Sequence, residues 1–198
     1  MSREVVLATG NAGKLREMQS MLEGSGITCR SQSEFDTPEA NEDGLSFVEN
    51  AIKKARNACK HTGLPAIADD SGLEILALNG APGIYSARYA GEPSNAKDNW
   101  QLLLKNMQDI DDEHRRARFV CVMVFMRHAE DPVPVICTGT WEGTLLREPQ
   151  GSNGFGYDPI FLSPEYGQSA AEIDRSEKNA ISHRSKALCC LVEALQNG

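Results

Sequence analysis

The stretch Val5-Val6-Leu7-Ala8-Thr9-Gly10-Asn11-Ala12-Gly13-Lys14 leads from an apolar run through a glycine-rich segment into a helical pattern. The apolar residues Val5–Ala8 predict a short buried strand. After Lys14, apolar residues recur at the spacing of one helix face, at Leu15, Met18, Met21 and Leu22. The segment Thr9–Lys14 is therefore predicted to be a turn at a helix N-terminus, where backbone N–H groups and the helix dipole favour a phosphate.

The glycine spacing excludes two common phosphate-binding motifs. A Walker A loop reads G-x-x-x-x-G-K-S/T, whereas here Gly10 and Gly13 stand closer together and Leu15 follows Lys14. This spacing disfavours a kinase-like phosphotransferase. The G-x-G-x-x-G pattern of dinucleotide folds is also absent. For this segment alone, an ordinary turn in which the glycines only relieve strain remains an equal alternative.

Composition bounds the class of protein. The chain has 198 residues and a net charge of −8, so we expect one domain over residues 1–198, with room for two lobes. The acidic balance argues against a nucleic-acid or membrane partner, and no apolar run is long enough to span a bilayer. The six cysteines form no C-x-x-C pair, and Met1–Glu4 show no signal-peptide pattern. These features predict a cytoplasmic protein with reduced thiols.

The order of predicted elements is that of an α/β protein. Ser46-x-x-Glu49 has the form of a capping box, and it marks the start of a helix. The expected elements of the first half are a strand at Ile27–Arg30, a loop at Ser33–Asp43, a helix from Ser46 to Gly63, a strand at Pro65–Ala68 and a helix at Asn95–Met107.

The second half of the chain has a different pattern. The apolar run Ala117–Met126 and the segment Val133–Thr140 predict an antiparallel hairpin. Helix returns near the end, with an apolar stripe at Leu188, Leu191, Val192 and Leu195. This combination predicts a mixed sheet with flanking helices rather than a regular doubly wound fold.

Two adjacent carboxylates follow the strand predicted at Pro65–Ala68. Asp69 and Asp70 are expected to end that strand, and Ser71-Gly72 to form a turn. Carboxylates in this position suit Mg²⁺, which is bound by one or two protein carboxylates beside substrate phosphates. For this segment alone, an Asx-type turn without a metal is at least as good an interpretation. Because side chains alternate along a strand, only one of the two carboxylates should face a given site.

An unusual aromatic lies in Gly154-Phe155-Gly156-Tyr157-Asp158-Pro159. The flanking glycines should leave Phe155 exposed enough to stack on a flat ring. Asp158 is placed to accept a hydrogen bond from a ring N–H. A turn that carries a core aromatic is the alternative for this segment alone.

A cluster of cationic and ring N–H donors precedes the last predicted helix, in Glu177–Arg184. Lys178, His183 and Arg184 favour a carbonyl or phosphate ligand. The alternative is a solvated helix start with Ser182 as its N-cap. We assign no role to the other three histidines.

Together these segments resemble, in order and spacing, the inosine/xanthosine triphosphate pyrophosphatase family, whose members hydrolyse deaminated purine nucleotides. The resemblance covers nearly the whole chain, and each string is only moderately specific alone. The matching strings are T-G-N-x-G-K at Thr9–Lys14, F-x-E-N-A at Phe47–Ala51, A-D-D-S-G-L at Ala68–Leu73, P-G-I-Y-S-A-R-Y at Pro82–Tyr89, G-F-G-Y-D-P at Gly154–Pro159 and E-K-N-x-I-S-H-R at Glu177–Arg184.

The resemblance implies an elongated, two-lobed single α/β domain around a long mixed sheet, and a homodimer. It implies Mg²⁺-dependent hydrolysis of a purine nucleoside triphosphate (dITP, ITP or XTP) to the monophosphate and pyrophosphate. Such an activity keeps deaminated purines out of DNA and RNA. A catalytically silent purine-nucleotide-binding regulator is the alternative, and the retained Asp69 and Asp70 count against it.

The resemblance also implies a metal site. Many relatives carry an acidic pair before the G-x-S/T-F segment, whereas this chain has Asn41 and then Glu42. Asp70 is the first expected ligand. The second is open among Glu42, Glu39 and Glu49, and we prefer Glu42 because Glu49 already has a capping role.

The roles expected of the other residues follow from the same resemblance. Asp70, or Asp69 beside it, would orient or deprotonate the attacking water. Lys14 would hold the triphosphate and stabilise charge on the leaving pyrophosphate. The expected substrate contacts are Thr9, Gly10, Asn11, Ala12, Gly13, Lys14 and Ser71 for the phosphate part, and Phe155, Gly156, Tyr157, Asp158, Lys178, His183 and Arg184 for the base.

Overall fold

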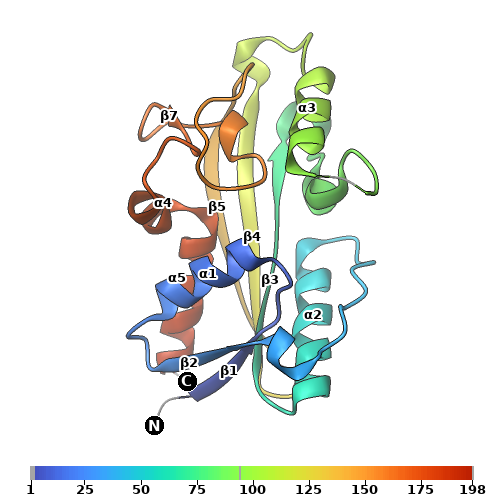
Figure 1. Cartoon of the computed structure of the whole chain (residues 1–198), viewed down its shortest axis with the longest axis vertical. Coiled ribbons are helices and arrows are strands. Elements are labelled where there is room, and N and C mark those ends of the chain that lie inside the picture. The colour runs from blue at the N-terminus through green and yellow to red at the C-terminus, as the bar shows by residue number, and fades with distance from the viewer. Residues whose placement is uncertain (1–2, 94, 198) are drawn as a thin grey trace. The chain divides into compact units, whose positions relative to one another are not determined.

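The computed structural model describes residues 3–93 and 95–197, and the expected lead-in residues Met1 and Ser2 lie outside them. The described strands form one sheet in the order β2-β1-β3-β4-β5-β6-β7 (Figure 1). β1 pairs in parallel with β2 and β3, whereas β6 is antiparallel to β5 and to β7. The predicted α/β class with a mixed sheet is therefore confirmed. The strands are β1 Arg3–Leu7, β2 Ile27–Ser31, β3 Ala66–Ile75, β4 Arg116–Met126, β5 Val135–Leu145, β6 Phe161–Ser163 and β7 Gln168–Ser169.

The α-helices begin and end largely where the sequence predicts. They are α1 Ala12–Leu22, α2 Phe47–Thr62, α3 Ala96–Asn106, α4 Arg175–Ile181 and α5 His183–Asn197. Ser46 caps α2 by accepting the Glu49 N–H, and Gly63 ends the helix in the left-handed conformation at φ 69°. The sequence missed α4. Among the described residues, none of the helices combines the length and the apolar character needed to cross a bilayer.

Short 3₁₀ helices replace parts of the expected loops. The segment Ser33–Asp43 was predicted to be loop throughout, but a 3₁₀ turn spans Gln32–Phe35 and is closed by a capping box between Ser31 and Glu34. The other 3₁₀ segments are Leu76–Leu78, Gly83–Arg88, Asp112–His114 and Asp158–Ile160.

The predicted end of β3 at Asp69-Asp70, followed by a glycine turn, is wrong. The strand continues through Asp69-Asp70-Ser71-Gly72 to Ile75, because buried Leu73 and Ile75 resume the apolar strand pattern and β4 is a neighbour in the sheet. Local turn chemistry is a weak preference that strand pairing overrides. The carboxylates therefore lie in the middle of a long strand, where their burial has to be balanced by other polar groups.

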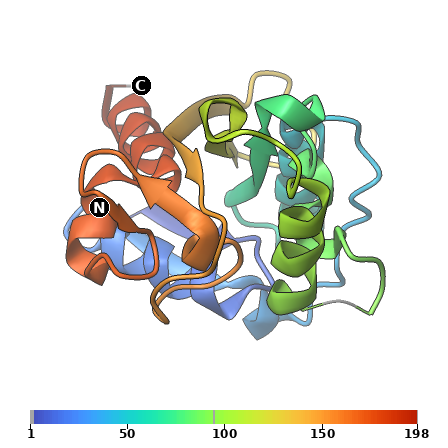
Figure 2. The same ribbon diagram turned by 90° about the horizontal axis from the view of Figure 1, so that it is seen from above.

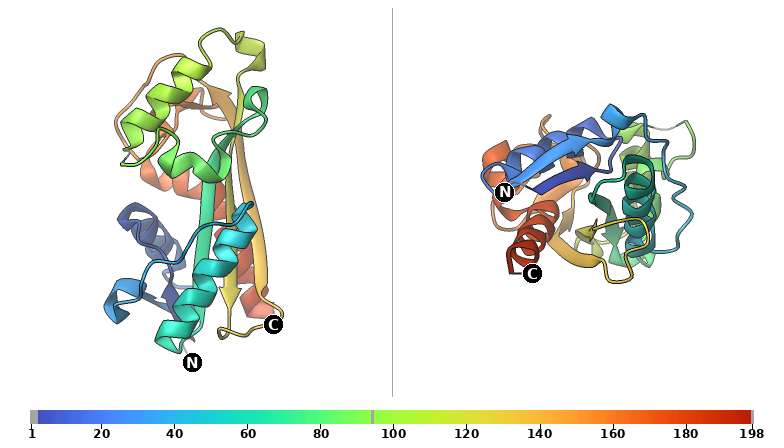
Figure 3. Two further views of the ribbon diagram at one scale, coloured as in Figure 1. Left: turned by 90° about the vertical axis from the view of Figure 1, so that its right-hand side faces the viewer. Right: turned by 90° about the horizontal axis from the view of Figure 1, so that it is seen from below.

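The described residues divide into two compact units. Unit 1 comprises residues 3–70, 121–139 and 184–197. Its core joins β1, β3, β4 and β5 to α1 and α5 through Val5, Leu7, Met18, Leu22, Ile67, Cys121, Met123, Phe125, Cys137, Ala187, Leu188 and Leu191. α2 lies on the opposite side of these strands from α5 (Figures 1 and 3), and it buries its small residues Ala51, Ala55 and Ala58. Side chains that alternate along β3 can therefore meet different helices.

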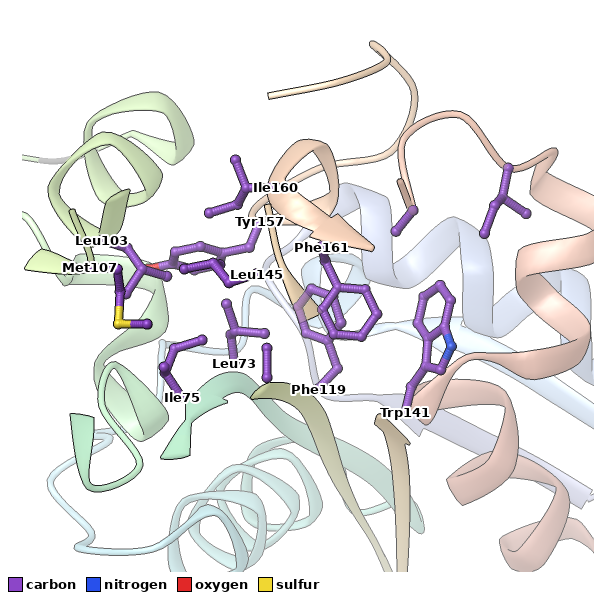
Figure 4. Close-up of a cluster of buried hydrophobic side chains, with 13 residues drawn as sticks. Leu73, Ile75, Leu103, Met107, Phe119, Trp141, Leu145, Tyr157, Ile160 and Phe161 are labelled. Atoms are coloured by element: carbon purple, nitrogen blue, oxygen red, sulfur yellow. The ribbon is translucent and has the colours of Figure 1, made fainter. Parts of the chain in front are cut away.

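Unit 2 comprises residues 71–93, 95–120 and 140–183. Its core is aromatic at one end, where Phe119, Trp141 and Phe161 pack together (Figure 4). At the other end Leu103 and Met107 belong to α3 and the turn after it. Figure 2 shows α3 and the segment around β6 from above. This core supports the segment that carries Phe155.

Candidate functional site

The glycine-rich segment forms the N-terminal cap of α1. The Asn11 Oδ1 atom accepts hydrogen bonds from the N–H groups of Gly13 at 2.9 Å and Lys14 at 3.1 Å, and Thr9 Oγ1 accepts from the Asn11 N–H at 3.2 Å. From the sequence, we expected these backbone N–H groups to bind a phosphate. In the structure two of them are bound by Asn11, which orders the turn from within.

Lys14 and Asp69 form a buried ion pair. Lys14 Nζ lies 2.8 Å from Asp69 Oδ2, and Asp69 has no exposed surface. Arg184 approaches the same oxygen at 3.7 Å, while its Nη1 lies 2.5 Å from Glu17. Burial opposes the charge on Asp69, but nearby Lys14, Arg184 and Lys54 outweigh it and hold the pKa of Asp69 well below its ordinary value. Asp69 is thus a poor proton acceptor and a strong counterion.

Asp70 has a different set of partners. Its Oδ2 accepts a hydrogen bond from Asn50 Nδ2 at 3.2 Å, and its Oδ1 lies 3.7 Å from Lys54 Nζ. Burial raises the pKa of Asp70, and the charge of Lys54 only partly offsets this effect. Lys14 and Arg184 come from α1 and α5, whereas Asn50 and Lys54 come from α2. The adjacent carboxylates therefore engage different helices, as strand alternation predicts.

Glu42 is linked to Asp70 through Lys54, whose Nζ lies 3.2 Å from Glu42 Oε2. The carboxylates of Glu42 and Asp70 thus lie around the same ammonium group, that of Lys54. Their all-oxygen donor set fits Mg²⁺, which prefers carboxylate ligands.

The two rival carboxylates have other surroundings. Glu49 Oε2 accepts from Ser46 Oγ at 2.7 Å and from the Leu45 N–H at 3.0 Å, which is the predicted capping role. Glu39 Oε1 lies 3.3 Å from the position that a Cβ on Gly10 would occupy, so its carboxylate borders the glycine-rich turn.

Sequence reasoning missed Asn50 and Lys54. Asn50 is 1% exposed on the face of α2 that buries alanines. A polar residue at a buried helix position is a usable signal, because such a group has to be hydrogen-bonded. Lys54 follows one turn later, and its partners come from distant segments.

The second cluster lies in unit 2 and contains Phe155, Asp158 and Lys178. Asp158 Oδ2 accepts from Lys178 Nζ at 2.5 Å and from the Phe155 N–H at 2.8 Å. Lys178 Nζ also lies 5.5 Å from the centre of the Phe155 ring. A Cβ on Gly154 would collide with Asp158. The segment is therefore ordered by its own ion pair, and Phe155 remains 36% exposed, as the sequence predicts.

The remaining expected base contacts are mostly buried. Tyr157 donates its hydroxyl hydrogen to the Ser86 carbonyl at 2.8 Å and packs in the core, so it anchors the segment. His183 begins α5, and its ring stacks on Phe119 with the centroids 4.8 Å apart and the planes 14° from parallel. Gly156 follows Phe155 with φ 66°, which suits a residue without a side chain.

Ser71, an expected phosphate contact, is half-buried in β3, next to Asp70.

Comparison with known proteins now places the chain. Residues 5–194 match the Ham1 family. The chain belongs to the Ham1 family. It is 57% identical over 196 residues to the dITP/XTP pyrophosphatase of Shigella flexneri, a match that covers 99% of this chain and 100% of that protein.

Two further Ham1-type relatives agree over the full length. The dITP/XTP pyrophosphatase of Thioalkalivibrio sulfidiphilus is 60% identical over 193 residues, covering 98% of both chains. The solved structure of a HAM1 protein from Coxiella burnetii has a TM-score of 0.92 and 52% identity, and the match covers 99% of this chain and 100% of that one. The seven-stranded mixed sheet is thus the Ham1 fold, and family membership agrees with the resemblance found in the motifs.

Proposed function

We propose that this chain hydrolyses the non-standard purine nucleoside triphosphates dITP, ITP and XTP to the monophosphate and pyrophosphate. Its full-length identity of 57% to an enzyme named dITP/XTP pyrophosphatase supports the reaction class. The observation that carries the proposal is the buried pair Asp69 and Asp70, because Asp69 forms an ion pair with Lys14 at 2.8 Å, whereas Asp70 is contacted by Asn50 and Lys54. Such an enzyme keeps deaminated purines out of DNA and RNA.

The metal is proposed to be Mg²⁺, held by Asp70 and Glu42. When bound, it neutralises phosphate charge that would repel an incoming hydroxide. The shared position of these two carboxylates around Lys54 Nζ supports this choice over Glu39 and Glu49. Asp70 is also the better candidate to take a proton from water, because its pKa is raised whereas that of Asp69 is lowered.

Lys14 is proposed to bind the triphosphate together with the turn Thr9–Gly13, and to stabilise charge on the leaving pyrophosphate. The ion pair with Asp69 holds the Lys14 ammonium group in a defined place before substrate arrives. Ser71, next to Asp70, is proposed as a further phosphate contact.

The base is proposed to meet the residues around Phe155, whose exposed ring offers a stacking surface. Lys178, His183 and Arg184 are donors that suit the 6-oxo group of hypoxanthine and xanthine. Arg184 carries five N–H donors, so its ion pair with Glu17 does not preclude a second acceptor. Adenine presents a 6-amino donor instead, and a mispaired buried donor costs roughly 1–3 kcal/mol.

Anion-exchange separation of the products of dITP, incubated with the protein and Mg²⁺, tests the reaction. Deoxyinosine monophosphate and pyrophosphate are expected. Diphosphate and phosphate as products would overturn the proposed bond cleavage. Tight binding of dITP without turnover would favour the alternative, a catalytically silent nucleotide-binding regulator.

The proposal also includes the oligomeric state and the cellular location of the protein. We predict that it forms a homodimer and that it lies in the cytoplasm. Light scattering after gel filtration should give twice the chain mass, and the mass of one chain at micromolar concentration would contradict the dimer.

A further inference from the structure

Asn50 has surroundings that an ordinary helix residue does not need. It lies on the buried face of α2 beside Ala51, and it is 1% exposed. A buried primary amide has to find hydrogen-bond partners for both of its ends, because an unpaired amide is costly away from water. The partners of Asn50 come from two other segments, namely Gly44 in the loop before α2 and Asp70 in β3.

The orientation of the Asn50 amide follows from its partners. The Gly44 N–H is a donor only, so the atom 2.8 Å from it has to be the side-chain oxygen. The NH₂ group is then turned toward Asp70 Oδ2, at 3.2 Å. A hydrogen bond to the backbone therefore fixes which end of the amide faces the carboxylate.

Gly44 is matched to this arrangement. A Cβ at Gly44 would lie 2.6 Å from Asn50 Oδ1 and 2.7 Å from the Glu49 Cβ, so a side chain would separate the loop from the helix. Gly44 stands two residues after Glu42. One amide thus ties together the segment that carries Glu42 and the carboxylate of Asp70.

We propose that Asn50 is a positioning residue that sets the orientation of Asp70 for the divalent cation. This inference rests on the proposed function, in which Asp70 and Glu42 hold that cation. With Oδ2 bound to Asn50, the other oxygen, Oδ1, faces Lys54 Nζ at 3.7 Å, on the same cation that Glu42 contacts. Without the amide, Asp70 would be able to rotate this oxygen away.

The chain offers a matched control for the experiment. Asn99 in α3 is also buried, at 3% exposed, and its amide also bridges two groups. Its Oδ1 accepts from the Ala90 N–H at 2.8 Å and its Nδ2 donates to the Ala87 carbonyl at 3.0 Å. These partners are backbone atoms of unit 2, with no carboxylate. Asn99→Ala therefore reproduces the loss of a buried bridging amide without touching Asp70.

The test compares Asn50→Ala, Asn50→Asp and Asn99→Ala with the unchanged chain. Asn50→Asp keeps an acceptor for the Gly44 N–H but, when ionised, has no N–H to donate to Asp70. Two quantities are measured: the Mg²⁺ concentration that gives half-maximal dITP turnover, and binding of Mn²⁺ as a probe, followed by electron paramagnetic resonance with and without a non-hydrolysable dITP analogue. Melting temperatures report whether each variant folds.

Asn50→Ala should raise the half-maximal Mg²⁺ concentration and weaken Mn²⁺ binding by roughly 10–100-fold, as removal of a hydrogen bond to a metal-binding side chain commonly does. Asn50→Asp should not restore the Mg²⁺ dependence of the unchanged chain. Asn99→Ala should lower the melting temperature and leave both metal readouts unchanged. If Asn50→Ala does not fold, Asn50→Ser takes its place with the same expectation.

Metal readouts for Asn50→Ala that match those of Asn99→Ala would overturn the positioning role. Restoration of the original Mg²⁺ dependence by Asn50→Asp would do so as well, because the Gly44 contact alone would then suffice. A different result would refute the proposed function itself: an unchanged chain that binds no Mn²⁺ and does not turn over dITP at any Mg²⁺ concentration. The two failures are therefore distinguishable.

Discussion

At the scale of single residues, Asp69 and Asp70 show how neighbours in sequence acquire opposite properties. Asp69 has Lys14 at 2.8 Å, whereas Lys54 lies 3.7 Å from Asp70. The pKa is consequently lowered at Asp69 and raised at Asp70, although burial acts in the same direction on both. Residue type and local sequence are the same for the two groups, so only their partners explain the difference.

Replacement of either carboxylate by an amide should affect stability in opposite directions. A lowered folded-state pKa means that ionised Asp69 stabilises the protein above its unfolded-state pKa, and that this contribution is lost as the pH falls through the folded-state value. A raised folded-state pKa means that ionised Asp70 costs stability once the pH exceeds that value. In metal-free buffer at pH 7, Asp69→Asn should lower the melting temperature and Asp70→Asn should keep or raise it.

Melting temperatures between pH 4 and pH 8 provide the check. The stability difference between the unchanged chain and Asp70→Asn should shrink toward acid pH. Equal losses for both variants at pH 7 would show that the two carboxylates have the same environment.

Replacement of the two proposed metal ligands, Asp70 and Glu42, should affect dITP turnover in different ways. Asp70→Asn should reduce dITP turnover to near background at saturating Mg²⁺, because an amide is a weaker magnesium ligand and does not accept the proton of water. Glu42→Gln should raise the Mg²⁺ requirement instead. Steady-state rates over a Mg²⁺ series distinguish the two effects. The choice of Glu42 is wrong if Glu39→Gln or Glu49→Gln raises that requirement and Glu42→Gln does not.

At the scale of elements, local capping interactions determine where a helix begins and ends, whereas tertiary packing determines whether a strand continues past a potential turn. The N-cap at Ser46 and the glycine at the end of α2 act within one turn of helix, and both were predictable. The continuation of β3 through Asp69–Gly72 was not, because its pairing partners lie elsewhere in the sequence. α4 has seven residues and no side-chain cap, so it offered no local signal.

The buried residue Arg115, just before β4, should contribute strongly to the stability of the fold. Its side chain is 2% exposed and donates to the carbonyl oxygens of Leu145 at 2.9 Å, Met107 at 2.6 Å and Leu146 at 3.0 Å. It thereby joins the end of α3 to the end of β5. Arg115→Met should lower the free energy of unfolding by about 3 kcal/mol, because buried carbonyl groups lose their donors.

Urea denaturation measures this loss, and Arg116→Met is the matched control because Arg116 is exposed. The control should change stability by less than about 0.5 kcal/mol. Arg115→Lys should recover little of the free energy of unfolding that Arg115→Met loses. An ammonium group lacks the planar arrangement of N–H donors with which the guanidinium group reaches several acceptors. Equal effects of Arg115→Met and Arg116→Met would contradict the structural role.

At the scale of the whole molecule, the two units carry different parts of the proposed recognition. Unit 1 contains Lys14, Asp70 and Glu42, which are proposed to hold the phosphates and the metal, together with Arg184, and unit 2 contains Phe155 and Lys178. Each cluster is ordered by its own buried ion pair, Lys14–Asp69 in one and Lys178–Asp158 in the other. Variants of the proposed phosphate residues and of the proposed base residues should therefore differ in how strongly their effect depends on the base.

A panel of kcat/KM values for dITP, XTP, dGTP and dATP tests this division. Lys14→Ala should lower all four by a common factor of roughly 100 or more, because the proposed substrate contact of the lysine is with phosphate and not with the base. His183→Ala should narrow the ratio of dITP to dATP, and Phe155→Ala should weaken all purines with little change in that ratio. Lys53→Ala is the control, since the Lys53 side chain is 42% exposed, pairs with Asp43 and has no proposed contact with the substrate. An unchanged dITP:dATP ratio in both His183 and Arg184 variants would place base selection elsewhere.

The sequence by itself determined the features that depend on near neighbours. The strand–turn–helix of Val5–Leu22, the capped start of α2 and the exposure of Phe155 follow from periodicity, capping chemistry and glycine placement, which act over a few residues. Only the tertiary structure decided that Asn50 bridges Gly44 and Asp70, and that Lys14 is held by Asp69. The contacts of Asp70 with Asn50 and of Lys14 with Asp69 join different elements of the chain, and no local preference encodes which distant partner a buried polar group will meet.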